Sequence, residues 1–370
     1  MAESRTPAAL PDLQRKPPLW QTPWFNTLGR FAALIAVFVL FAVLVEKGKF
    51  YSVRNLESIL RQSAVYATAA LGMTLVIIAA GIDLSVGSMI ALAAVMAAWT
   101  LNLNFAGAEG EMVYVIDQWP VMLPILAVAA ALATGTAAGA LNGCTIVYLR
   151  LVPFIVTLGT MGIFRGLAKG IAEDKSISPK DGAWVEDIME PTLSGLATEL
   201  GKPAEVRGDL SPYWTLLPPG VWMLIVAAVF AALLLRYTRF GRHVFAVGSN
   251  EETARLCGVP VARTKIIVYA LAGFFAGLAG LMQFSFTKVG SSTTAISYEL
   301  HVIAAVVIGG GSLRGGEGSI VGSLIGALVI TVLSMGGQQA GWPKWVQEVV
   351  IGVIIIAAVA LDQLRHRRLA

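Results

Sequence analysis

The chain has 370 residues, of which 56% are hydrophobic and only 14% are charged, and its mean hydropathy is +0.72. This composition excludes a water-soluble enzyme, because a soluble surface needs more polar side chains than such a sequence supplies. The net charge of +4 is small, and the two cysteines, Cys144 and Cys257, are expected to be reduced, unpaired thiols.

Uncharged runs long enough to cross a bilayer recur along the chain. A helix of about 20 residues spans the roughly 30 Å of hydrocarbon. Such runs lie between Arg61 and Asp83, between Asp83 and Glu109, and between Asp117 and Arg150. Further spans are expected at 28–45, from 151 onward, and at 210–235, 266–287, 318–343 and 349–361. The stretch 302–313 is too short to cross the membrane alone. It either completes a crossing by extending into neighbouring polar residues or forms a re-entrant segment. We predict an all-α membrane protein, a polytopic helical bundle of about 10 transmembrane helices, some of them interrupted.

Basic residues predict the orientation of these spans. They gather before the first span, within 236–265 and at the end of the chain, and basic loops favour the cytoplasmic side. We expect a cytoplasmic leader at 1–27, a transmembrane domain at 28–361 and a cytoplasmic tail at 362–370. Within the domain, loop 236–265 would be cytoplasmic and the polar loop at about 172–209 extracytoplasmic. Both termini would then lie inside.

Two distant segments resemble each other. VIIAAG (76–81) followed by VGSMIALAA (86–94) resembles VVIGGG (306–311) followed by EGSIVGSLI (317–325). Each copy has an apolar half, a glycine-rich turn with a charge, and a Gly-Ser step into a helix of small residues. Related halves with broken helices are common in transporters, where they mark the transport path. We therefore expect two pseudo-repeated halves.

Small residues recur at four-residue spacing in two of the expected spans. The stretches are ALATGTAAGALNG (131–143) and GFFAGLAGL (273–281). In lipid, such stripes let helix backbones approach closely. Both are expected to be packing faces.

Asp83 stands within an apolar stretch, where a charge costs roughly 2.5 to 3.5 kcal/mol at the bilayer centre on insertion scales. One interpretation is a helix cap, in which Asp83 accepts hydrogen bonds from the amides of Ser85 or Val86 at a helix that begins near Leu84. The other is a polar passage in which Asp83, Ser85 and Ser88 offer hydrogen-bonding groups to a hydroxylated solute.

The second copy carries two charges in its turn. Arg314 and Glu317 either neutralise each other or Arg314 reaches Asp83, because buried charges in membranes usually pair. A structural network is favoured over direct contact with solute. The candidate residues for a translocation path or buried polar network are Asp83, Ser85, Gly87, Ser88, Arg314 and Glu317.

The basic loop RYTRFGRHVFAVGSNEETARLCGVPVARTK (236–265) contains signals for a short helix. Ser249 and Glu252 form a capping box, and Gly258 is a suitable C-terminal stop, so a helix of about eight residues is predicted. It is either a surface helix held by the chain's own loops or a docking knob for a cytoplasmic protein. Its expected apolar side consists of Ala254, Cys257 and Val261.

Motifs for catalysis do not occur in the sequence. It has no GxxxxGK[ST] phosphate-binding loop, and the histidines His243, His301 and His366 are scattered without ligand spacing. We expect no catalytic residue, no metal, no cofactor and no nucleic-acid partner. The chain itself is not expected to be an enzyme.

Three long stretches carry a resemblance to a known family. GMTLVIIAAGIDLSVGS (72–88), FGRHVFAVGSNEETARLCGVPVARTKIIVYALAGFFAGLAGL (240–281) and YELHVIAAVVIGGGSLRGGEGSIVGSLIGAL (298–328) resemble the permease subunits of bacterial ABC importers for monosaccharides, the ribose, xylose and galactose class. The segment with Asp83, Ser85 and Gly87 matches the family's most recognisable motif.

The resemblance implies a permease dimer, formed with a second copy or a sister chain, in the bacterial inner membrane. An ATPase subunit would bind inside, an extracytoplasmic sugar-binding protein would deliver solute outside, and alternating access would move it. The polar loop 172–209 is longer than expected and would alter contact with the binding protein. The coupling helix that enters the ATPase would include Ser249, Asn250, Glu251, Glu252, Ala254, Arg255 and Gly258.

Other functions remain open from the sequence. The same type of importer could carry a nucleoside, inositol or a furanosyl signalling molecule, whereas GIDLSVGS favours sugars over branched-chain amino acids. An ion-coupled secondary transporter would use Asp83 with Glu317 as its coupling site. A channel or scaffold would need neither an ATPase nor a binding protein.

Overall fold

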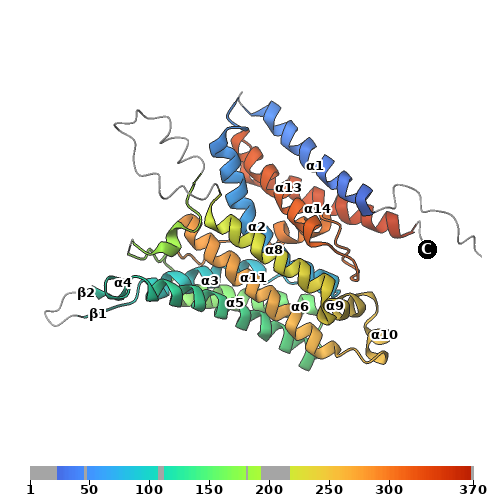
Figure 1. The fold of residues 1–370 in the computed structure, drawn as a ribbon, viewed down its shortest axis with the longest axis horizontal. Coiled ribbons are helices and arrows are strands. Elements are labelled where there is room, and N and C mark those ends of the chain that lie inside the picture. The colour runs from blue at the N-terminus through green and yellow to red at the C-terminus, as the bar shows by residue number, and fades with distance from the viewer. Residues whose placement is uncertain (1–22, 46–47, 107–111, 181, 193–216, 368–370) are drawn as a thin grey trace, which may run out of the picture.

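A computed structural model of the protein describes residues 23–45, 48–106, 112–180, 182–192 and 217–367. Residues 1–22 of the expected leader, 193–209 of the expected polar loop and 368–370 of the expected tail lie outside this part. The described chain is a helical bundle with one small two-stranded sheet (Figure 1).

The long helices are α1 (Pro23–Leu44), α2 (Val53–Ile78), α3 (Val86–Leu101), α5 (Met122–Tyr148), α6 (Pro153–Ile171), α8 (Pro219–Tyr237), α11 (Val261–Thr287), α13 (Ile320–Gln339) and α14 (Lys344–Arg367). Shorter elements are α4 (Val115–Gln118), the 3₁₀ helix η2 (Trp184–Asp187), α9 (Arg239–Ser249), α10 (Glu251–Leu256) and α12 (Tyr298–Ile308). Strands β1 (Asn104–Ala106) and β2 (Met112–Tyr114) pair antiparallel, with Phe105 opposite Val113.

Helices occupy the expected apolar segments, except for residues 210–216, which are not described. Among the described residues, α2, α5, α6, α8, α11 and α13 are long and apolar enough to cross a membrane, while the apolar parts of α1, α3 and α12 are shorter. A mostly helical fold with several candidate membrane spans is therefore confirmed. The total of about ten crossings stays a prediction.

Local sequence signals position several helix starts. Ser52 caps α2 by accepting a hydrogen bond from the Asn55 amide at 3.3 Å. Ser319 caps α13 in the same way, with the Gly322 amide at 3.4 Å. Pro153 is the first residue of α6, where its missing amide hydrogen costs nothing.

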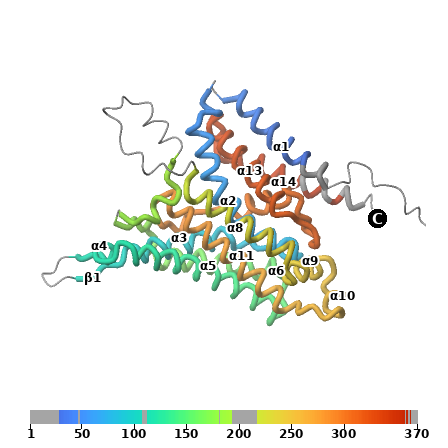
Figure 2. Tube along the Cα trace, viewed as in Figure 1, coloured from blue at the N-terminus to red at the C-terminus, as the bar shows by residue number. Residues whose placement is uncertain are grey.

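Helix α2 runs through the middle of the bundle. It packs against α8, α11, α12 and α13, with α3, α5 and α6 on the side of α11 and with α1 and α14 on the side of α13 (Figures 1 and 2). Most residues of α2, α11 and α13 are buried, whereas fewer than half of those in α5, α6 and α8 are, and many apolar side chains of these three helices are exposed. Such exposed apolar faces suit contact with lipid.

The two small-residue segments pack against each other where α5 crosses α11. A methyl group added at Gly139 would lie 2.1 Å from the Tyr269 carbonyl oxygen, and one added at Gly135 would lie 2.3 Å from that of Gly273. The expected packing faces are therefore confirmed, and each proves to be the other's partner.

Substituting Gly139 by valine should destabilise the bundle, because the new side chain would overlap the α11 backbone. Overpacking of this kind costs about 1 to 3 kcal/mol or more. Gly159, on α6, is the matched control, since nothing lies within 4 Å of a methyl group added there. Thermal unfolding in detergent should show a lower midpoint for Gly139→Val than for Gly159→Val, and equal midpoints would contradict this packing.

Helices α2 and α12 end in the same way, about 230 residues apart. The Gly81 amide donates to the Val76 carbonyl at 2.9 Å, and the Gly311 amide donates to the Val306 carbonyl at 2.8 Å. The residue before each glycine is left-handed, with φ of 59° and 82°. These are the bonds of a Schellman-type helix end, so the two copies share a backbone shape as well as a sequence pattern.

Beyond these ends the copies differ. Helix α3 begins at Val86, before its Gly-Ser step at 87–88, whereas α13 begins at Ile320, directly after its own step at 318–319. The second turn is longer and contains two further left-handed glycines, Gly315 and Gly316. The geometry therefore repeats at the interruption and not in the helix that follows.

Residues 172–180 and 182–192, which precede α8 in the described chain, lie at the end of the bundle that carries β1 and β2 (Figure 1). Ile177 and Gly290 exchange two backbone hydrogen bonds of 2.8 and 2.9 Å, and Ser285 Oγ accepts from the Met189 amide at 2.9 Å. Lys288 Nζ lies 2.6 Å from Glu190 Oε1, and this hydrogen bond raises the pKa of the Lys288 amine. The described part of the expected 172–209 loop is thus fixed on α11.

Candidate translocation and coupling site

Asp83 lies in the break between α2 and α3 and is only 1% exposed. Its Oδ1 accepts hydrogen bonds from the Ser85 amide at 2.8 Å and from Ser85 Oγ at 2.6 Å. The expected bond from the Ser85 amide is therefore present, although α3 begins at Val86 rather than near Leu84. Asp83 holds the turn that starts α3.

Ser85 links this turn to a neighbouring helix. Asn142 on α5 donates from Nδ2 to Ser85 Oγ at 2.8 Å, and Ser88 Oγ donates to the Ser85 carbonyl oxygen at 2.8 Å. Asp83, Ser85, Ser88 and Asn142 are all buried. The first break is thus a closed polar cluster in this conformation.

Two further side chains border the break, and neither was among the predicted site residues. Thr157 on α6 donates to the Ile82 carbonyl oxygen at 3.3 Å. The Tyr269 hydroxyl on α11 lies against Gly81, where an added methyl group would be 2.6 Å away. Asn142 was also missed, although it is the single amide within a stretch of small residues that had been interpreted only as a packing face.

Three buried polar atoms in this cluster have no hydrogen-bond partner within the described chain. They are Asp83 Oδ2, Asn142 Oδ1 and the Tyr269 hydroxyl, one each from the break, α5 and α11. Buried polar atoms are nearly always paired in native proteins. The cluster therefore retains hydrogen-bonding capacity. In the described residues, no group of histidine, cysteine, aspartate and glutamate could hold a metal ion.

Gly87 allows α3 to approach the start of α12. A methyl group added there would lie 2.5 Å from Glu299 Oε2 and 2.6 Å from the Ala295 carbonyl oxygen. Its role is thus close packing, beside the polar cluster rather than within it.

The structure corrects the expected positions of Arg314 and Glu317. Both side chains are exposed, whereas Asp83 is buried, so neither belongs to the buried network. The reason is that the second turn is longer than the first. Its glycines pack closely against neighbouring segments, which leaves the two charged side chains at the surface. Ser312 Oγ accepts from the Arg314 amide at 3.4 Å, a bond within the turn itself.

The two breaks and the basic loop meet at one backbone junction. The Gly316 amide donates to the Ile78 carbonyl oxygen, the last of α2, at 2.8 Å. A methyl group added at Gly248 on α9 would lie 1.7 Å from that same oxygen and 2.7 Å from the Gly316 nitrogen. We call Ile78, Gly248 and Gly316 the glycine junction. It joins the end of α2, the turn before α13 and the end of α9 without an intervening side chain.

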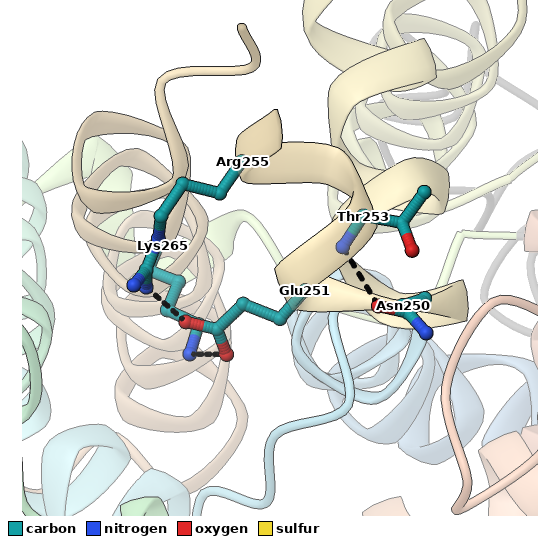
Figure 3. A network of polar contacts seen from close by, with 5 residues as sticks. All are labelled: Asn250, Glu251, Thr253, Arg255 and Lys265. Carbon is teal, nitrogen blue, oxygen red and sulfur yellow. Dashed lines mark hydrogen bonds and ion pairs between the residues drawn. The ribbon is translucent and has the colours of Figure 1, made fainter. Parts of the chain in front are cut away.

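Helix α10 directly follows this junction, and its start differs from the prediction. Ser249 is the last residue of α9 and donates from Oγ to the Phe245 carbonyl oxygen at 2.9 Å, so it does not cap α10. Asn250 is the cap, and its side chain accepts from the Thr253 amide at 2.8 Å (Figure 3). Helix α10 has six residues instead of about eight.

The end of α10 agrees with the predicted stop at Gly258. Gly258 has φ of +80°, its amide donates to the Arg255 carbonyl at 3.0 Å, and the Val259 amide donates to the Ala254 carbonyl at 3.0 Å. These two bonds form a Schellman motif. Ala254 packs with Val247 and Val261, whereas the expected apolar residue Cys257 is exposed.

A single carboxylate fixes α10 to the start of α11. Glu251 accepts from Lys265 Nζ at 2.6 Å and from Arg255 Nη2 at 3.1 Å, one bond to each of its oxygens (Figure 3). Glu252 and Leu256, on the same helix, are exposed, Leu256 to 87%. Helix α10 is therefore a short, capped helix that is anchored on one side and free on the other.

The bundle of apolar helices with two interruptions is that of a multi-pass membrane protein. The protein family described as branched-chain amino acid transport system / permease component matches residues 55–359, and the chain belongs to this family. No solved structure matches the chain.

Curated relatives cover nearly the whole chain. It is 37% identical over 331 residues to the ribose import permease protein RbsC of Escherichia coli (strain K12), covering 89% of this chain and 92% of that protein. It is 35% identical to the galactose/methyl galactoside import permease protein MglC of Salmonella typhimurium, covering 93% and 96%. It is 32% identical to the xylose transport system permease protein XylH of Haemophilus influenzae, covering 90% and 96%. The expected resemblance to the ribose, xylose and galactose permeases is confirmed.

Proposed function

We propose that the chain is the transmembrane permease subunit of an ATP-binding cassette importer for a monosaccharide. Relatives named as ribose, galactose and xylose permeases support the solute class. The observation that carries the mechanism is the glycine junction, where the loop bearing α10 touches both helix interruptions through backbone atoms. A displacement of α10 would therefore be transmitted to both interruptions through backbone contacts.

In this mechanism α10 is the coupling helix of a chain that does not hydrolyse ATP itself. Its exposed side, with Glu252 and Leu256, would enter a separate ATPase subunit, while Glu251 keeps the helix on α11. When ATP binding closes the ATPase subunits, α10 moves, and Gly248 carries the motion to Ile78. The breaks then rearrange and open the path toward the other side.

The polar cluster at the first break would serve the solute during this rearrangement. Its unpaired oxygens suit hydroxyl groups, and a passage needs only weak hydrogen bonds when a sugar-binding protein selects the solute outside. The permease would pair with a second copy or with a sister chain. Nucleosides, inositol and a furanosyl signalling molecule are alternative solutes for the same machinery.

We further propose about ten crossings in two related halves, with both termini in the cytoplasm of a bacterium. The matching ends of α2 and α12 support the repeat. The C-terminal end of α14 lies at the same end of the bundle as α10 (Figure 1), as this orientation requires.

The capture of partners from the native membrane tests the proposal. The tagged chain should co-purify with an ATPase that vanadate inhibits and with a soluble binding protein, both identified by mass spectrometry. That binding protein can then be screened for its sugar. Recovery of the chain without any ATPase would refute the importer and favour an ion-coupled transporter that uses Asp83.

Substitutions at the end of α10 test its coupling role. Gly258→Pro removes the amide that bonds to Arg255 and excludes the φ of +80°. It should lower sugar uptake about fivefold or more, since losing a helix end costs about 1 kcal/mol or more and displaces α10. Gly258→Asn is the matched control, because asparagine tolerates the left-handed region. Both Gly258 variants should assemble in the membrane like the wild type.

Glu252→Lys should lower sugar uptake as Gly258→Pro does, because it reverses the charge on the exposed side of α10. Uptake and sugar-stimulated ATPase activity are measured in proteoliposomes containing all subunits. Normal uptake by both Gly258→Pro and Glu252→Lys would contradict the assignment of α10.

A further inference from the structure

A cavity of about 750 Å³ lies beside α10, between the α5–α6 turn and the start of α11. Its charged lining consists of Arg150, Arg255, Arg263, Lys265 and Glu251. Four basic side chains thus share the cavity with a single carboxylate.

Both oxygens of that carboxylate already have partners. Glu251 binds Lys265 and Arg255 with its two oxygens (Figure 3). Arg150 and Arg263 are exposed and form no ion pair with any residue that the structure describes. The cavity therefore has excess positive charge, with two guanidinium groups that lack a counter-ion and can each donate two parallel hydrogen bonds to a phosphate.

Arg150 is held in an uncommon backbone conformation. Its φ is 53°, in the left-handed region that non-glycine residues seldom adopt. Strained positions of this kind are concentrated at functional sites. The turn thus fixes the arginine at the rim of the cavity, between the last turn of α5 and the first of α6.

The rim of the cavity on the α5–α6 side is apolar and exposed. Tyr148, Leu149 and Val152 are 75%, 64% and 59% exposed, and Leu151 belongs to the cavity lining itself. On a membrane protein, such side chains at a helix end contact acyl chains. A basic cavity bordered by acyl-chain contacts has the chemistry of a phospholipid headgroup site.

We propose that this cavity binds the phosphate of an anionic phospholipid, whose acyl chains lie along the α5–α6 turn. Its assignment to the cytoplasmic leaflet rests on the proposed function, whereas headgroup binding rests on the cavity alone. The phosphate would bind Arg150 and Arg263, and it would compete with Glu251 for Arg255 and Lys265. The lipid would then stabilise the position of α10 on the membrane surface.

The test uses the purified full-length chain in nanodiscs of phosphatidylcholine, with or without phosphatidylglycerol. Phosphatidylglycerol should raise the melting temperature of the wild type. The double variant Arg150→Gln/Arg263→Gln should lose more than half of that shift, because both unpaired cations are gone. Its unfolding without phosphatidylglycerol should be unchanged, since neither side chain has a partner within the described fold.

A matched control carries the same change in net charge elsewhere on the loop. Arg239→Gln/Arg242→Gln removes two exposed arginines of α9 that do not line the cavity, and it should keep the full shift. Native mass spectrometry should show phosphatidylglycerol retained on the wild type and on this control, and lost from Arg150→Gln/Arg263→Gln. If both double variants lost phosphatidylglycerol equally, the lipid would be attracted by surface charge in general, and the proposed site would be refuted.

Two further results would also overturn the proposal. If inorganic phosphate in phosphatidylcholine nanodiscs reproduces the shift, the site takes a free anion and not a lipid. If Arg150→Gln/Arg263→Gln keeps the lipid shift but loses capture of the ATPase, the cavity serves the partner protein. No ATPase or sugar takes part in the lipid measurement, so its failure leaves the importer proposal standing, and failed ATPase capture leaves the lipid result standing.

Discussion

Replacing Gly248 by alanine should abolish sugar uptake, although it adds only one methyl group. That methyl would lie 1.7 Å from the Ile78 carbonyl oxygen, with the Gly316 amide 2.7 Å away. Neither neighbour is the end of a flexible side chain, so α9 must move away from α2 or the Gly316–Ile78 hydrogen bond must break. Overpacking costs about 1 to 3 kcal/mol or more, which corresponds to about 5- to 150-fold or more in a coupling equilibrium.

Gly159→Ala is the control for this substitution. Gly159 is also helical, and nothing lies within 4 Å of a methyl group added there, so the same change should leave uptake near the wild-type level. The measurement is ATP-driven uptake in proteoliposomes, together with the amount of assembled protein by size-exclusion chromatography. Loss of uptake from an assembled Gly248→Ala protein supports transmission through the glycine junction.

A second variant keeps the test informative if Gly248→Ala does not assemble. A methyl group at Gly316 would lie 2.6 Å from Ser249 Oγ, which can turn away if it gives up its hydrogen bond to Phe245, and 3.1 and 3.2 Å from the Ser249 Cα and nitrogen, while the φ of +75° adds strain. Gly316→Ala should therefore assemble and lose part of the uptake. Full uptake by Gly316→Ala, or by an assembled Gly248→Ala protein, would exclude the junction as a route of coupling.

Hydropathy alone predicted where the helices lie, because each span must satisfy its own backbone in lipid. Helices α5 and α11 were also recognised as packing faces from their small residues. Their pairing, and the approach of Gly248 to Ile78, could not be predicted, since both depend on how segments far apart in sequence come together. In the sequence, Gly248 is one glycine in a polar loop.

The cap of α10 shows how neighbouring signals compete. The segment SNEET offers Ser249 with Glu252 and Asn250 with Thr253 as alternative starts. Helix α9 extends through Ser249, with Val244, Val247 and Gly248 buried, and this tertiary packing leaves Asn250 as the first free residue. Local pattern predicted that a short helix exists, while packing decided where it begins.

The polar residues at the breaks show a related limit. Asp83 was recognised because a charge in an apolar run needs an explanation, and Asn142 was missed because an amide among alanines and glycines looks ordinary. For Arg314, one of the two interpretations was that it reaches Asp83, because buried charges in membranes usually pair. Its exposure depends on the path of the longer turn across the glycine junction, which no local pattern encodes.

Asp83→Ala should prevent assembly of the protein. It removes the acceptor for both the amide and the hydroxyl of Ser85, which stay buried. A lost helix cap costs about 0.5 to 2 kcal/mol, and each buried group left unpaired costs about 1 to 3 kcal/mol more. We expect little assembled protein by size-exclusion chromatography, and wild-type amounts with wild-type uptake would show that the turn does not need this side chain.

Asp83→Asn separates the importer from the ion-coupled alternative. Asparagine keeps an acceptor oxygen for Ser85 but carries neither a charge nor a transferable proton, so the start of α3 should survive. An importer driven by ATP should then retain uptake, because its energy comes from the partner subunit. A transporter that couples to protons or sodium through Asp83 should lose it. Two uptake measurements distinguish these mechanisms: one with ATP and no ion gradient, the other under an imposed ion gradient without ATP. Loss of ATP-driven uptake from an assembled Asp83→Asn protein would mean that the charge itself takes part in transport.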